Sequence, residues 1–373
     1  MFASNIGSST SHNNKIVLNK GEMRTFRAFL QPIEAGRLRW RFRFSNCVDS
    51  TWDDGSECWA DLPGGRFEIV SASACAATPE RFAAPVRVTW SGEASRAVEP
   101  NAWAVSDAVE LDIPLGGRIA FSWCLRALED GCLLPATPDC RALCFSAEGD
   151  AAFASMAAFH EDDMTCLPDA FEADRPVRAR MVFMGDSITQ GVQTRVDLFE
   201  QWAARIARGI ERDITVWNIG LGYGRGADAA KGGAWLGKAA GADIVNLCFG
   251  VNDLLHGSRD ADALTADLRA AISGLRARNP RVKVVLFTVP PFDLTGDDEI
   301  RWRTVNERIR GGDHLGADAV FDMAAILACE APKDNMAFFG GHPDGRGGAA
   351  VAGEYLTVFW PTHRGALLPG GAL

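Results

Sequence analysis

From about residue 180 onward the chain alternates short, continuously apolar segments with helix-like segments. The apolar segments are ARMVFMG, ITVWNIG, ADIVNLCFG, VKVVLFTVP and DAVFDM. The helix-like segments fall at 197–211, 261–278, 298–310 and 346–360. A strand that is apolar along its whole length is buried on both faces, which is typical of a parallel sheet covered by helices on both sides. The sequence therefore predicts an α/β domain with a parallel sheet over residues 180–373.

The first 150 residues show a different pattern, in which apolar and polar side chains alternate. In RLRWRFRFSN, for example, Leu38, Trp40 and Phe42 alternate with arginines. A period of two indicates a strand with one buried face. Several such segments follow one another with turn residues and no convincing helix between them. We therefore predict an all-β sandwich, jelly-roll-like, over residues 1–150, and a linker or wrap-around segment over residues 151–179.

Composition limits the partners of this chain. Its 373 residues suffice for two cores, and its net charge of -10 argues against nucleic acid or an anionic membrane as the main partner. No apolar run has the length of a transmembrane helix. The polar N-terminal segment lacks the apolar region of a secretory signal, so we expect a cytoplasmic protein; secretion stays open if a signal has been removed from the sequence.

The ten cysteines do not form a recognisable metal site. None belongs to a CxxC pair, and no Cys/His cluster has the spacing of a zinc site, so we expect no metal. Several lie inside apolar runs, as Cys124 and Cys248 do, and we expect them to be reduced core residues. Eight of the ten precede residue 170, which leaves a disulfide in that half open.

The segment MVFMGDSITQG, residues 181–191, places Ser187 directly after the first predicted parallel strand. Functional groups in such sheets gather at the carboxyl ends of the strands. A serine at the start of the following helix lies beside unpaired backbone N–H groups and the positive end of the helix dipole. This setting suits a nucleophile whose attack creates an oxyanion, although a helix-capping serine fits the same pattern.

Later strand ends supply the other groups that a serine nucleophile needs, namely a base and donors for the oxyanion. In WNIGLGYGRG, Gly222 and Gly224 leave backbone N–H groups unshielded by side chains. In FGVND, Asn252 offers a side-chain amide, and in FFGGHPDGRGG, His342 offers a base.

The four blocks GDSIT, N-x-G-x-G, G-x-N-D and H-P, in this order, resemble the SGNH or GDSL-type hydrolase superfamily over residues 180–360. The resemblance implies a flavodoxin-like three-layer α/β/α domain that cleaves carboxylic esters without metal or cofactor. It implies that Ser187 is the nucleophile, that His342 is the base, and that Asn252 helps the Ser187 N–H and the 222–224 turn to bind the oxyanion. The segments RWRFRFSN and SDAVELDIPLGGRIAFSWCLR also resemble the β-rich N-terminal region of some bacterial members.

Two positions depart from the family pattern. Five residues after Asn218, where the family has its oxyanion glycine, stands Tyr223, so Gly222 and Gly224 remain alternative donors. Three residues before His342, where the family has an aspartate, stands Phe339. Three interpretations follow: a backbone carbonyl near Phe339 orients the histidine, Asp334 or another acid does so, or the site has decayed.

The expected activity is hydrolysis of a small-molecule or glycan ester through an acyl-serine intermediate, with a short acyl group such as acetyl on a carbohydrate. The alternatives are a catalytically inactive carbohydrate-binding protein and an acyltransferase. Two tryptophans in a turn-rich segment, Trp52 and Trp59, are candidates for a surface or cleft-rim role. His256, four residues beyond Asn252, either lines the cleft or caps a helix.

Overall fold

The computed structural model describes residues 1–50, 60–78, 81–138, 142–195 and 198–370. These residues form two compact units, of which the first holds nearly all of the described chain up to Pro176 and the second begins at Val177. Each unit has its own sheets and its own core, and each is described by itself below.

The first unit is built from antiparallel strands, as its alternating sequence predicts. One sheet contains β1 (Phe2–Ser4), β17 (Ala170–Asp174), β4 (Gly36–Ser45), β10 (Trp103–Val105) and β11 (Val109–Ile113). The larger sheet contains β15 (His160–Glu161), β14 (Leu143–Glu148), β3 (Met23–Leu30), β12 (Arg118–Ala127), β7 (Phe67–Ala77), β8 (Val86–Arg87) and β9 (Arg96–Val98). Smaller elements are β2 (Asn14–Leu18), β13 (Cys132–Pro138), β16 (Met164–Thr165), β5 (Cys47–Ser50), β6 (Ala60–Pro63) and the 3₁₀ turn η1 (Met156–Ala158).

Aromatic side chains from the two sheets meet in the core of this unit. Phe42 of β4 lies with its ring centroid 4.3 Å from that of Phe121 of β12. Phe44 and Trp123, from the same two strands, meet edge to face at 5.0 Å. All four side chains are buried. Because both sheets bury the apolar face of their strands against each other, the predicted β-sandwich is confirmed.

Residues 151–179, predicted to be a linker or wrap-around segment, contribute short strands to the first unit. Among these strands, β17 lies between β1 and β4 and pairs antiparallel with both. β17 is short, and Ala170–Ala173 are all buried, so its sequence does not show the alternation of a strand with one buried face.

The second unit contains the predicted parallel sheet. Its strands are β18 (Ala179–Gly185), β19 (Ile214–Asn218), β20 (Ile244–Cys248), β21 (Lys283–Phe287) and β22 (Ala319–Phe321). They lie in the order β19-β18-β20-β21-β22, and every neighbouring pair is parallel. This is the flavodoxin-like strand order, so the predicted fold of the domain is confirmed.

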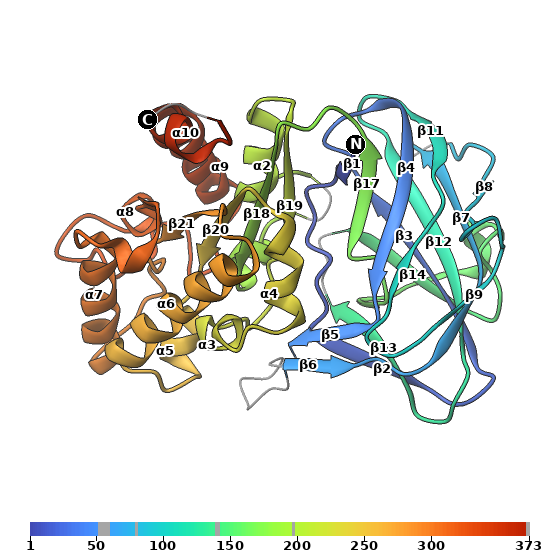
Figure 1. Cartoon of the computed structure of the whole chain (residues 1–373), viewed down its shortest axis with the longest axis horizontal. Coiled ribbons are helices and arrows are strands. Elements are labelled where there is room, and N and C mark those ends of the chain that lie inside the picture. The colour runs from blue at the N-terminus through green and yellow to red at the C-terminus, as the bar shows by residue number, and fades with distance from the viewer. Residues whose placement is uncertain (51–59, 79–80, 139–141, 196–197, 371–373) are drawn as a thin grey trace. The chain divides into compact units, whose positions relative to one another are not determined.

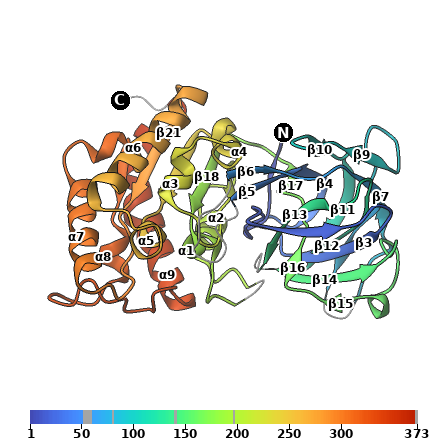
Figure 2. The ribbon, with the colours of Figure 1, turned by 90° about the horizontal axis from the view of Figure 1, so that it is seen from below.

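Helices cover both faces of this sheet. In Figure 1, α2 (Trp202–Gly209), α9 (Gly345–Glu354) and α10 (Trp360–Leu367) lie above the strands, and α3 (Gly226–Ala230), α4 (Ala234–Lys238) and α6 (Ala261–Arg278) lie below them. Figure 2 shows α6 and α9 on opposite sides of the sheet. The remaining elements are α1 (Ser187–Gln190), α5 (Val251–Leu255), α7 (Asp297–Arg310), α8 (Met323–Leu327), η2 (Ala239–Gly241), η3 (His314–Gly316) and the π-helical turn η4 (Tyr355–Phe359).

Some sequence predictions concern residues outside the described part of the chain. Trp52 and Trp59, the candidates for a rim role, belong to this group, and so do Cys58 and Cys140. No disulfide joins two of the described cysteines. Across the described ranges, every helix is too short or too polar to cross a membrane.

Tyr355 is the basis of a stability prediction for the second domain. Its side chain is fully buried among aromatic rings, and its hydroxyl donates a hydrogen bond to Asn246 Oδ1 at 3.0 Å. Tyr355→Phe keeps the ring but leaves a buried carbonyl oxygen without a donor. We expect the free energy of unfolding of this domain to fall by about 1–3 kcal/mol, measured by urea denaturation.

The matched control is Thr357→Val on the same turn, since Thr357 is exposed and also loses one hydroxyl. We expect its effect to stay within about 0.5 kcal/mol. Equal stability of the Tyr355→Phe variant and the native protein would contradict the prediction.

Candidate functional site around Ser187 and His342

The turn that carries Ser187 is set by a close approach of the backbone at the end of β18. A Cβ atom on Gly185 would lie 2.4 Å from the carbonyl oxygen of Cys248 and 2.1 Å from Thr189 Oγ1, so only glycine fits. The next residue, Asp186, caps α1 by accepting the N–H of Ile188 at 2.9 Å. Ser187 therefore stands at the first position of a short helix, directly after the strand.

His342 lies beside this serine although 155 residues separate them in the chain. Ser187 Oγ and His342 Nε2 are 2.7 Å apart and form a hydrogen bond. The histidine comes just before α9, whose first N–H groups are capped by Asp344. The ring of Phe292 packs edge-on against the imidazole, with centroids 5.2 Å apart. The structure thus brings together the predicted nucleophile and the predicted base.

Burial sets the charge state of the histidine. Because the partly buried site disfavours the imidazolium, the pKa of His342 is lowered from its ordinary value of 6.5. The neutral ring therefore predominates at neutral pH. A neutral imidazole next to a hydroxyl is able to accept the hydroxyl proton.

The structure does not bring Asp334 to His342. Its carboxylate accepts two hydrogen bonds from the guanidinium of Arg303 on α7, at 2.8 and 2.9 Å, and makes none with the histidine. The carbonyl of Phe339 instead accepts the N–H of Asp344 at 3.3 Å. Among the described residues, none forms a hydrogen bond with His342 Nδ1. The observed unit is thus a serine–histidine pair, with the imidazole held by Ser187 and Phe292.

The turn after β19 approaches the same strand end. Leu221 donates its N–H to the carbonyl of Gly185 at 2.9 Å, which ties the turn to the residue two before Ser187. Gly224 donates its N–H to the carbonyl of Leu221 at 2.9 Å, so this predicted oxyanion donor is already engaged within the turn. Gly222 is buried in the turn. Between them, Tyr223 has a left-handed φ of 60°, and its N–H donates to no described residue.

The third strand end brings Asn252 to this turn. Asn252 Nδ2 donates to the carbonyl of Gly224 at 3.2 Å, and the second N–H of this amide is not used by any described residue. Gly250, which precedes α5, has a φ of 130°, and a Cβ there would lie 2.6 Å from Val289. His256 ends α5, and its ring lies beside that of Tyr223 with centroids 6.2 Å apart.

Two buried carboxylates support this arrangement. Asp253 accepts the N–H groups of Gly226 and Ala227 at 2.9 and 3.1 Å and so holds the start of α3. Burial raises the pKa of Asp253 to about 6. Burial, with a contribution from the charge of Asp253, raises the pKa of Asp186 to about 7. Sequence reasoning assigned no role to Asp253, although the G-x-N-D block contains it, and Phe292 left no signal in the sequence.

Within the described residues, the His/Asp group whose ligand atoms are close enough to hold a metal ion lies in the first unit and not around Ser187. It consists of His12, Asp49 and Asp169, which are buried and whose ligand atoms lie within 4.8 Å of one another. The site around Ser187 contains a hydroxyl, an imidazole, a side-chain amide and backbone N–H groups, which together can bind and attack an acyl carbonyl.

The comparison with protein families agrees with this geometry. The GDSL-like Lipase/Acylhydrolase family matches residues 183–350, a range that contains Ser187, Asn252 and His342. No curated protein matches the chain significantly.

Several solved structures are similar to the chain at low identity. A family two carbohydrate esterase from Clostridium thermocellum, in complex with cellohexaose, is 13% identical with a TM-score of 0.42, and the match covers 97% of this chain and 99% of that one. A family two carbohydrate esterase from Cellvibrio japonicus is 12% identical with a TM-score of 0.39, over 97% and 96% of the two chains. A family 3 carbohydrate esterase from Talaromyces cellulolyticus is 18% identical with a TM-score of 0.38, over 50% and 98%.

TM-scores below 0.5 are too low to support an inference about substrate, so the assignment rests on the family match. Residues 183–350 belong to the GDSL-like lipase/acylhydrolase family, and the chain therefore carries a hydrolase domain of this type.

Proposed function

We propose that the protein cleaves carboxylic esters through an acyl-serine intermediate formed on Ser187. The hydrogen bond of 2.7 Å between Ser187 Oγ and His342 Nε2 carries this proposal. In the first step Ser187 Oγ attacks the ester carbonyl while His342 takes its proton. His342 then gives this proton to the leaving alcohol, which leaves the acyl group on the serine. Water, deprotonated by His342, attacks this ester; the bond between the acyl group and Ser187 Oγ breaks, the acid leaves, and His342 returns the proton to Ser187 Oγ.

Three donors are proposed to bind the oxyanion that each attack creates. The N–H of Ser187 at the start of α1 and the N–H of Tyr223 donate to no described residue. One N–H of the Asn252 amide donates to the carbonyl of Gly224, which holds the amide in place, and the other N–H is proposed to donate to the oxyanion. The family position counted from Asn218 supports Tyr223 over Gly224, whose N–H is engaged in the turn. Preorganised donors of this kind stabilise the transition state without reorganising during the reaction.

The proposed substrate keeps the short acyl group of the sequence prediction, with acetyl on a carbohydrate as the leading case. One observation supports a sugar: the Tyr223 ring is 40% exposed and belongs to the same residue as the proposed oxyanion donor. An exposed aromatic ring offers an apolar face on which a sugar ring can stack. The intact serine–histidine contact argues against the alternative of a decayed site, and acyl transfer to an acceptor sugar uses the same acyl-serine.

Loss of either member of the pair should abolish turnover. We expect Ser187→Ala and His342→Ala each to lower kcat for p-nitrophenyl acetate by about 10⁴-fold or more, because the two residues act as a unit. Asp334→Asn is the control, since that carboxylate pairs with Arg303, and we expect it to retain activity. A native protein as inert as the two alanine variants would contradict the proposal. Partition of product toward an added acceptor sugar would instead identify a transferase.

Loss of the Asn252 amide should slow the chemistry more than it weakens binding. We expect Asn252→Ala to lower kcat by about 10²–10³-fold with a smaller change in KM, because the oxyanion exists only in the transition state. Asn279→Ala serves as a matched control, since this residue follows the end of α6 and its amide donates to the carbonyl of Ala242 instead, at 2.8 Å. A KM effect alone would show that Asn252 binds the ground state.

The pH dependence of kcat/KM should report the lowered pKa of His342. Burial favours the neutral imidazole, so the base form persists to lower pH and the acid limb should have its midpoint below 6.5. Because Asp334 does not contact the ring, Asp334→Asn should not move this midpoint. A midpoint above 6.5, or one that shifts in Asp334→Asn, would show that a carboxylate faces the histidine during catalysis.

A further inference from the structure

A pocket of about 400 Å³ lies in the first unit, on the face of the larger sheet that points away from the sandwich core. Its floor is formed by outward-facing side chains of β3, β7 and β12, among them Arg27, Ser73 and Ser122. The neighbours of these residues in the strands, such as Phe26 and Phe121, point into the core instead. The alternation of the strands therefore separates a polar floor from the apolar interior.

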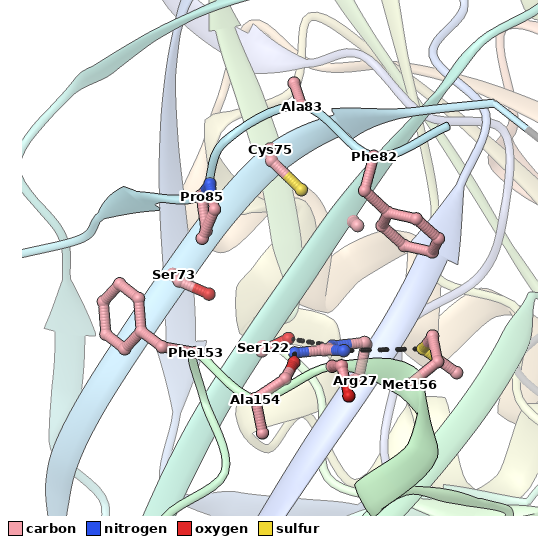
Figure 3. Close-up of a pocket in the computed structure, with 12 residues that line it drawn as sticks. Arg27, Ser73, Cys75, Phe82, Ala83, Pro85, Ser122, Phe153, Ala154 and Met156 are labelled. Atoms are coloured by element: carbon pink, nitrogen blue, oxygen red, sulfur yellow. Dashed lines mark hydrogen bonds between the residues drawn. The ribbon is translucent and has the colours of Figure 1, made fainter. Parts of the chain in front are cut away.

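The walls of this pocket are apolar and come from two segments outside the strands. Figure 3 shows Phe82 and Pro85 in the upper part of the view and Phe153 and Met156 in the lower part, with Phe82 and Phe153 at opposite ends. Phe82 packs edge-on against Phe29, with centroids 5.5 Å apart, yet remains 46% exposed. Exposed aromatic walls above a polar floor are typical of sites for small organic ligands, and the volume lies in the range of such sites.

Arg27 is a buried cation without a counter-charge. The residue is 7% exposed, and its hydrogen-bond and ring partners are neutral. Nε donates to Ser122 Oγ at 2.5 Å, and Nη2 donates to the carbonyl of Ala154 at 2.9 Å. The guanidinium also lies 4.0 Å from the centre of the Phe159 ring. Across the described ranges, no carboxylate forms an ion pair with Arg27, and burial lowers its pKa.

One nitrogen of the guanidinium, Nη1, has only a weak hydrogen-bond acceptor. Nη1 faces Met156 Sδ at 3.4 Å, as the dashed line in Figure 3 shows. A thioether is a weak acceptor, so a stronger acceptor entering the pocket would replace it at little cost. Cys75, which also lines the pocket, adds no negative charge because burial raises the pKa of its thiol.

We propose that this pocket binds a small organic monocarboxylate, whose carboxylate pairs with Arg27 and whose apolar body packs between Phe82 and Phe153. A single guanidinium matches a single carboxylate in charge and in planar geometry. The aromatic walls suit an apolar or aromatic body better than a sugar, because Ser73 already donates its hydroxyl to the carbonyl of Ala152 at 2.6 Å. The site lies wholly within the first unit and does not depend on the ester hydrolysis proposed above.

The test uses 3-phenylpropanoate as the probe and the neutral 3-phenylpropanamide as its isosteric control, with binding to the full chain measured by isothermal titration calorimetry at neutral pH. We expect the carboxylate to bind and the amide to bind more weakly by about 10- to 100-fold, since a hydrogen bond to a charged partner is lost. Arg27→Gln should weaken binding of the carboxylate by a similar factor. Its turnover of p-nitrophenyl acetate should not change, which would place the binding away from Ser187.

Phe82→Ala provides a second variant, because Phe82 is half exposed and its truncation buries no new polar group. This variant should weaken binding of the carboxylate severalfold, and it keeps the test possible if Arg27→Gln fails to fold. The proposal is overturned if the amide binds as well as the acid, if both variants bind like the native chain, or if the acid does not bind at any soluble concentration.

Discussion

The site depends on how closely three strand ends approach one another at Gly185. The backbone there passes so near the carbonyl of Cys248 that a side chain would collide with it. Its own carbonyl holds the turn after β19 through the N–H of Leu221. Asn252 in turn holds that turn through the carbonyl of Gly224. Residues from three separate segments are thereby fixed to one stretch of backbone. These contacts determine where each segment lies relative to Ser187.

Much of the fold and part of the site could be predicted from the sequence, because both follow from patterns that local physics determines. Continuous apolar strands between helices require a covered parallel sheet. In such a sheet the carboxyl ends of the strands share one edge, so the residues that follow them are expected near one another. Ser187 and Asn252 follow strands β18 and β20 and do lie at this edge. His342 joins them from the start of α9, as its motif suggested.

The rest could not be predicted, because it depends on groups that are distant in the chain. Sequence distance makes Asp334 a candidate partner for His342, but both of its carboxylate oxygens accept hydrogen bonds from Arg303 on α7. The direction of the Tyr223 N–H depends on a left-handed φ that no residue type other than glycine signals reliably. Among the described residues Arg27 has no carboxylate partner, and this likewise depends on residues of three strands that are distant in the chain.

The pairing of β1 with β17 has a consequence for the order of events during synthesis. Phe2 lies opposite Asp174, so the first strand of the sandwich has no partner until nearly the whole first unit has left the ribosome. Contacts between residues so far apart in sequence form slowly, since the entropy of closing a long loop is lost before these contacts contribute any stabilisation. Until then β4 lacks the strand that pairs with one of its edges. The nascent chain therefore carries an open sheet edge for most of the translation of this unit, and an unpaired edge of this kind is prone to aggregation until β17 is made.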